Sequence, residues 1–184
     1  MKNYLIVHGS FGNPFINWFN WFHNDISKNE NQVIIPQFPV GLDYQNYNNW
    51  KKLLDYYKST GLIDENTIFI GHSIGSIFIV KYLIENKLKS HKIILISGFN
   101  NYTVDGGDYD KVNSSFFLEN ISGIKELASE IICIYGDNDP YVKQEALKEF
   151  ANEIATKQVV IPDGGHLNSE FGYDSFNEIL DYIN

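Results

Sequence analysis

The sequence predicts an α/β fold, a mostly parallel sheet of about six strands with helices on both faces. Short apolar segments rich in β-branched residues alternate with segments of helical periodicity along the 184-residue chain. Such alternation favours parallel strands joined by right-handed connections. The segment 68–80, IFIGHSIGSIFIV, joins an apolar strand to an apolar helix through a tight turn, as a strand covered on both faces requires. Functional residues of such sheets gather beyond the carboxyl ends of the strands.

The first half of the chain contains two expected strand and helix units. We expect strands at 4–8 and 32–36 and a polar helix at 43–59, which Gly61 ends. The helix after the first strand should have Asn13 as its N-cap and Pro14 as its first residue, where the missing N–H of proline costs nothing. Apolar residues at helical spacing predict that this helix faces the core; they are Phe15, Trp18, Phe19, Phe22 and Ile26.

The second half continues the alternation. The third strand ends at the tight turn, and its helix runs to about residue 86. Further strands are expected at 92–96, 130–135 and 158–161, and helices at 121–128, at 142–154 and at the end of the chain. The segment 99–115 is rich in Asn, Gly and Asp and has no regular period, which predicts a long loop. Loops of this length are often functional, and this one starts at the same sheet edge as the tight turn.

Composition and charge limit the possible functions. A hydrophobic content of 43% over 184 residues indicates one globular domain, 1–184, with a large core. The net charge of −9 repels nucleic acid and anionic lipid, so we expect neither as a partner. Cys133 is the only cysteine and is expected to be a buried strand thiol. We expect no membrane-spanning helix and no secretory signal, and hence a cytoplasmic protein.

The tight turn has the pattern of a nucleophile elbow. Gly71 and Gly75 flank Ser73 as G-x-S-x-G, the arrangement in which a sharp strand-to-helix turn lifts a serine hydroxyl above a parallel sheet. Strand and helix pass too close there for Cβ atoms. The alternative is an ordinary turn whose serine caps the helix. The other groups that a nucleophilic serine needs decide between the two.

A serine needs a base, and His166 is our candidate. A histidine suits this role at neutral pH, and the Gly-rich loop after the last strand lets His166 reach back toward Ser73. The base needs a carboxylate to orient it. Asp137 and Asp139 both follow the fifth strand; we favour Asp139, partly on the family pattern given below, and interpret Asp137 as a turn former. The oxyanion of the reaction would be held by the backbone N–H groups of Ile74 and Ser10.

Four motifs together resemble the α/β-hydrolase superfamily, and within it the small serine hydrolases of the retinoblastoma-binding-protein-nine and YdeN type. They are His8-Gly9, Gly71-His72-Ser73-Ile74-Gly75, Gly136-Asp137-Asn138-Asp139-Pro140-Tyr141-Val142 and Gly164-Gly165-His166, with Asn13-Pro14, Trp18 and Pro36-x-x-Pro39 as further similarities. The resemblance covers nearly the whole chain. It implies an α/β-hydrolase fold, an acid at Asp139, a base at His166, and hydrolysis of carboxylic esters or related acyl compounds without metal or organic cofactor.

The chain departs from larger relatives in having no full lid domain. Only a loop and a short helix lie between Ser97 and Glu130, so we expect an open, shallow pocket that an aromatic set partly covers; the set is Phe99, Tyr102, Phe116 and Phe117. The leading hypothesis is a serine hydrolase of a small-molecule acyl ester. Two alternatives remain: a protein-interaction module that uses exposed aromatic residues of 99–117, and an amidase or peptidase, since the same groups cleave amides.

Overall fold

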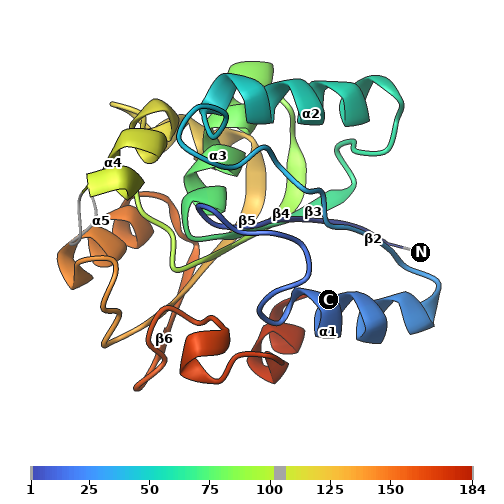
Figure 1. The fold of residues 1–184 in the computed structure, drawn as a ribbon. Coiled ribbons are helices and arrows are strands. Elements are labelled where there is room, and N and C mark those ends of the chain that lie inside the picture. The colour runs from blue at the N-terminus through green and yellow to red at the C-terminus, as the bar shows by residue number, and fades with distance from the viewer. Residues whose placement is uncertain (1, 102–106, 184) are drawn as a thin grey trace.

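The predicted α/β class is confirmed: the protein has an open parallel sheet with helices on both faces (Figure 1). The computed structural model describes residues 2–101 and 107–183. All described strand pairs are parallel and lie in the order β2-β1-β3-β4-β5-β6. The strands are β1 (Asn3–Val7), β2 (Gln32–Ile34), β3 (Thr67–His72), β4 (Ser90–Ile96), β5 (Ala128–Gly136) and β6 (Lys157–Ile161).

Helices bury both faces of the sheet. One face packs against α2 (Tyr47–Ser59), α3 (Ile74–Asn86) and α5 (Gln144–Ile154), and the other against α1 (Phe19–Ile26) and the closing 3-10 helix η5 (Asn177–Tyr182). Alternate strand residues enter different cores, Leu5 the first and Ile6 the second, because strand side chains point to opposite faces in turn. Cys133 is buried in the first core, as predicted, and burial raises the pKa of its thiol to about 12.

The remaining elements are short. Helix α4 (Gly107–Asn113) runs into the 3-10 helix η2 (Ser114–Phe116), and three more 3-10 helices are η1 (Ser27–Asn29), η3 (Ser122–Glu126) and η4 (Ser169–Phe171). The segment predicted to be a loop at 99–115 therefore contains a helix in its described second part. Within the described residues, no helix is long and apolar enough to cross a bilayer.

The first helix begins later than predicted. It starts at Phe19 instead of Pro14. The Asn13 side chain does accept a hydrogen bond from the Phe15 N–H at 2.9 Å, as an N-cap would, but Asn17 has a φ of 57°, which interrupts a right-handed helix. Phe15 is consequently 76% exposed and lies outside the apolar stripe. The other members of the stripe are buried as predicted; they are Trp18, Phe19, Phe22 and Ile26.

Two other helix predictions need correction. Helix α2 begins at Tyr47 instead of residue 43, because Asn46 acts as its N-cap and accepts from the Asn49 N–H at 2.9 Å. The helices expected at 121–128 and at the chain end are 3-10 helices, η3 and η5. These corrections do not change which residues follow strands β1, β3, β5 and β6. The candidate site depends on those residues.

Candidate active site

Ser73 occupies the turn between β3 and α3 in a strained backbone conformation. Its φ is 56° and its ψ is −127°, a region that L-residues rarely adopt and that costs about 1–3 kcal/mol. The Ser73 N–H donates to the carbonyl oxygen of Ile96 on the neighbouring strand at 2.8 Å, which helps to hold the turn. The conformation is that of the elbow expected from the sequence pattern.

The two flanking glycines are required by close backbone contacts. A Cβ at Gly71 would lie 2.6 Å from the Cα of Ser76. A Cβ at Gly75 would lie 2.7 Å from the carbonyl oxygen of His8 and closer still to that of Val7. Strand β1 and helix α3 therefore touch at Gly75, which brings the loop after β1 against the turn that carries Ser73.

Replacing Gly75 with alanine is expected to destabilise the fold by about 3 kcal/mol, because the neighbours of the new methyl group are backbone atoms that cannot rotate away. Urea unfolding measures the loss. Gly123→Ala is the matched control, since a Cβ there would have no atom within 4 Å and the residue does not adopt a positive φ. Equal stability of the two variants would show that β1 and α3 are not in tight contact.

His166 is held by Asp139. The ring Nδ1 lies 2.7 Å from Asp139 Oδ2, and both residues are buried. The second carboxylate oxygen, Oδ1, accepts from the N–H groups of Tyr141 at 2.8 Å and Val142 at 3.0 Å. The carboxylate is thus fixed by two backbone donors. It accepts the proton of Nδ1 and leaves Nε2 as the nitrogen that can act as a base.

Asp137, the other acidic residue after β5, has a different part in the structure. Its Oδ1 accepts from the backbone N–H of Asp163 at 2.8 Å, a contact within the loops that carry the site. Asn138 between the two acids accepts from the Gly165 N–H at 2.7 Å. The arrangement agrees with the interpretation of Asp137 as a turn-forming residue, and it is Asp139 that contacts the histidine ring.

Two side chains also hold the backbone of His166 in place. Its carbonyl oxygen accepts hydrogen bonds from His72 Nε2 at 3.0 Å and from Ser97 Oγ at 3.2 Å. Ser97 and Leu167 have positive φ values of 48° and 50°. The loop after β6 is therefore tied to the ends of β3 and β4, so that the histidine ring stays over the sheet edge.

Two other histidines near the site are neutral. His8 Nε2 accepts from the Phe38 N–H at 3.1 Å, so its Nδ1 carries the proton and donates to Gly9 O at 2.8 Å. Burial lowers the pKa of His8 to about 4. Burial, and then the neighbouring His166, lower the pKa of His72 to about 3. Both rings act as packing and hydrogen-bonding groups at neutral pH.

Protonation of these two rings is expected to destabilise the protein in weak acid. In the unfolded chain both titrate at a pKa of about 6.5, whereas the folded values are about 4 and 3. Between these values the unfolded state binds more protons, so stability is full above about pH 6.5 and falls as the pH is lowered. The two rings together should reduce the unfolding free energy by about 2–3 kcal/mol between about pH 7 and pH 5.5.

Urea unfolding over this pH range tests the expectation. His8→Gln should remove about half of the pH dependence of the unfolding free energy. His23 is exposed, and His23→Gln is the control that should keep the wild-type pH dependence. A wild-type unfolding free energy that stays constant over the range would contradict it.

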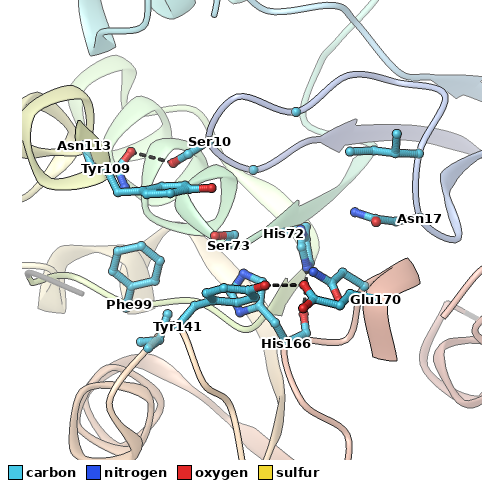
Figure 2. A pocket seen from close by; sticks show the side chains of 15 residues that line it. Ser10, Asn17, His72, Ser73, Phe99, Tyr109, Asn113, Tyr141, His166 and Glu170 are labelled. Atoms are coloured by element: carbon cyan, nitrogen blue, oxygen red, sulfur yellow. Dashed lines mark hydrogen bonds between the residues drawn. The ribbon is translucent and has the colours of Figure 1, made fainter. Parts of the chain in front are cut away.

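Ser73 and His166 line one pocket of about 220 Å³ at the carboxyl edge of the sheet (Figure 2). The other lining residues are Gly9, Ser10, Gly12, Ile16, Asn17, His72, Phe99, Tyr109, Asn113, Tyr141, Val142, Asn168 and Glu170. Gly9 lies against the serine, because a Cβ there would be 3.0 Å from Ser73 Cβ. Among the described residues, the hydrogen bonds include none from Ser73 Oγ to His166; such bonds often form only when substrate is bound.

Of the two predicted oxyanion donors, Ile74 directly follows Ser73 in the chain and Ser10 lines the same pocket as Ser73. Ile74 is the first residue of α3, so its N–H lies at the positive end of the helix dipole. Ser10 lines the pocket, and its hydroxyl donates to Asn113 Oδ1 at 2.6 Å. The adjacent Phe11 N–H donates to Gln45 Oε1 at 2.8 Å. These two contacts fix the loop after β1.

The aromatic cover differs from the prediction. Phe99 does line the pocket, but Phe116 is fully buried in the core against Trp50 and Phe78. Phe117 packs on Phe99 instead of covering the pocket. Tyr102 lies outside the described residues. Tyr109 and Tyr141, which sequence reasoning missed, provide the aromatic lining.

Glu170, Asn113 and Asn17 were also missed. Glu170 lies four residues after His166, and Tyr141 two after Asp139, so proximity to the predicted acid and base was the available signal. Asn113 contacts Ser10 across 103 positions of the chain, for which no local pattern exists. Within the described residues, no group of three or more His, Cys, Asp or Glu side chains is placed to bind a metal ion.

Comparison with known proteins identifies the family. The model of the serine hydrolase family matches residues 4–184. The chain belongs to the serine hydrolase family. YdeN from Bacillus subtilis is 26% identical over 184 residues, which cover 99% of this chain and 94% of YdeN. Its crystal structure superposes with a TM-score of 0.86 at 25% identity, covering 98% of this chain and 96% of that one.

One further curated protein and one further solved structure are similar to this chain. The serine hydrolase RBBP9 of Rattus norvegicus is 32% identical over 111 residues, which cover 59% of this chain and 57% of RBBP9. Est1E of Butyrivibrio proteoclasticus shares the fold with a TM-score of 0.69 at 16% identity, covering 97% of this chain and 83% of that one. Membership in the family makes this member a hydrolase and an enzyme, and confirms the resemblance seen in the sequence motifs.

Proposed function

We propose that this serine hydrolase cleaves small carboxylic esters through an acyl-enzyme, with Ser73 as nucleophile, His166 as base and Asp139 as the acid that orients it. One observation carries the proposal. The His166 ring is hydrogen-bonded to a buried carboxylate at 2.7 Å and lines the same pocket as a serine on a strained turn. A nucleophile, a base and an orienting acid in this arrangement are what acyl transfer requires.

The reaction would proceed in two displacements. Ser73 Oγ attacks the ester carbonyl while His166 Nε2 takes its proton; the imidazolium is stabilised by Asp139. His166 then gives the proton to the leaving alcohol as the carbon–oxygen bond breaks. Water, deprotonated by the same nitrogen, attacks the acyl-enzyme and releases the acid. The N–H groups of Ser10 and Ile74 would hold the oxyanion, each contributing about 3 kcal/mol.

Pocket size supports a small acyl group. The cavity of about 220 Å³ is bounded by the aromatic rings of Phe99, Tyr109 and Tyr141, which leaves little room for a long chain. The protein-interaction alternative started from exposed aromatic residues in 99–117, and the burial of Phe99 and Phe116 removes two of them. No contact in the pocket favours an amide over an ester, so we propose the ester, whose alcohol leaves more readily.

A series of p-nitrophenyl esters of increasing acyl length tests the proposal. We expect turnover of acetate and butyrate esters and a steep fall in kcat/KM for the octanoate and longer esters. Fluorophosphonate should give a single covalent adduct on Ser73, located by intact mass and peptide mapping. A folded protein that neither hydrolyses an ester nor forms the adduct would refute the proposal.

A further inference from the structure

The pocket has two chemically different sides. In Figure 2, Phe99 and Tyr109 lie on one side of Ser73, and Asn17 and Glu170 lie on the other. Val142 adds a buried aliphatic side chain to the pocket. The first side, which in Figure 2 also carries Ser10 and Asn113 next to Tyr109, offers two aromatic rings to the hydrocarbon part of a substrate. The second is polar and contains a carboxylate.

Glu170 is the single acidic side chain among the described residues that line this pocket, and neither lysine nor arginine lines it. The Tyr141 hydroxyl donates to Glu170 Oε2, and this bond raises the pKa of Tyr141 to about 12. Tyr141 therefore stays a donor at neutral pH, and it orients the carboxylate. Glu170 Oε1 remains for an additional partner, because a carboxylate can accept several hydrogen bonds.

Two buried acceptors without partners belong to the same pocket lining. Asn168 Oδ1 and His72 Nδ1 are both buried and have no hydrogen-bond partner within the described residues. His72 Nδ1 is an acceptor, because the other nitrogen donates to the His166 carbonyl oxygen. Both atoms are fully buried, so the exposed carboxylate of Glu170 is an acceptor in the lining that a ligand N–H can reach.

The position of Tyr141 relates Glu170 to the leaving group. The Tyr141 ring packs edge-on against the His166 ring, with centroids 5.3 Å apart, and its hydroxyl reaches Glu170. The leaving oxygen must approach His166, which gives it a proton. A leaving group bound at His166 would therefore be able to extend toward Tyr141 and Glu170.

We propose that Glu170 selects esters whose leaving group carries a protonated amine, with the acyl group on the side of Phe99 and Tyr109. The inference rests on the proposed ester hydrolysis and adds the substrate class. A cationic leaving group would be attracted by the Glu170 carboxylate, which Tyr141 orients. An anionic leaving group would be repelled by it, and neither lysine nor arginine lines the pocket to offset that repulsion. Because Glu170 is exposed to solvent, the preference is expected to be moderate and sensitive to salt.

The test compares two butyrate esters of nearly identical shape, dimethylaminoethyl butyrate, which is cationic at neutral pH, and isopentyl butyrate, which is neutral. The measured quantity is the ratio of their kcat/KM values. Glu170→Gln should lower this ratio by about threefold to fivefold at low salt, the upper part of the range of an exposed ion pair. The different intrinsic reactivities of the two esters cancel when the ratio is compared between variants.

Glu149→Gln is the matched control. Glu149 is exposed on α5 and does not line the pocket, so the variant changes the net charge equally and should keep the wild-type ratio. About 0.5 M salt should lower the wild-type ratio toward that of Glu170→Gln. If both esters are hydrolysed and Glu170→Gln keeps the wild-type ratio, the inference is wrong while the ester proposal stands. If neither ester is hydrolysed and fluorophosphonate does not label Ser73, the ester proposal fails and the inference falls with it.

Discussion

Ser73→Ala is expected to lower kcat/KM for p-nitrophenyl butyrate by at least about 10⁴-fold, because the variant has no nucleophile and only binding and oxyanion stabilisation remain. The expected loss follows from the proposed role of a serine whose turn is strained and whose neighbourhood contains the Asp139–His166 pair. Steady-state hydrolysis measures the loss, and intact mass after fluorophosphonate treatment should show no adduct.

Two controls separate this loss from unfolding. The unfolding free energy of Ser73→Ala should lie within about 1 kcal/mol of the wild type, because alanine keeps the backbone N–H that bonds Ile96. Ser10→Ala removes the hydroxyl of the other serine that lines the pocket, which bonds Asn113, and should still form the fluorophosphonate adduct. Turnover by a folded Ser73→Ala protein at the wild-type rate would assign the nucleophile elsewhere.

The sequence predicts the sheet because its strands are buried on both faces. Apolar runs such as 68–70 and 93–96 leave no solvent-facing alternative, and parallel pairing then brings the loops after β1, β3, β5 and β6 to one edge. The two candidate acids for His166, Asp137 and Asp139, are only two positions apart in the same loop. The cause of the pairing with Asp139 is visible only in the structure, where Tyr141 and Val142 N–H groups hold the Asp139 carboxylate.

Features that depend on one residue's backbone conformation or on distant partners could not be predicted. Asn13 and Pro14 have the pattern of a helix start, yet the left-handed φ of Asn17, 57°, delays the helix to Phe19. The polar side of the pocket depends on the bond between Tyr141 and Glu170, which are 29 positions apart. Periodicity reports which face of an element is buried, but it does not report which polar side chains meet above the sheet.

Asp139→Asn is expected to lower kcat/KM by about 10⁴-fold with little change in stability, because it traps His166 in the wrong tautomer. Two backbone donors determine how the new amide side chain is oriented. Tyr141 and Val142 N–H groups would keep the amide oxygen of the new side chain in the place of Oδ1, so the amide NH₂ would point at His166 Nδ1. That nitrogen would then have to accept, the proton would move to Nε2, and the ring could not take a proton from Ser73.

Asp137→Asn is the matched control, with the same chemical change two residues away. The amide oxygen can still accept from the Asp163 N–H, and the ring of His166 is not contacted, so kcat/KM should stay within about threefold of the wild type. The rate of fluorophosphonate labelling should follow the same order, since it too requires a base at Nε2. Equal losses of kcat/KM in the two variants would mean that the loop after β5 acts through its overall charge or conformation. The proposal that Asp139 orients His166 would then be wrong.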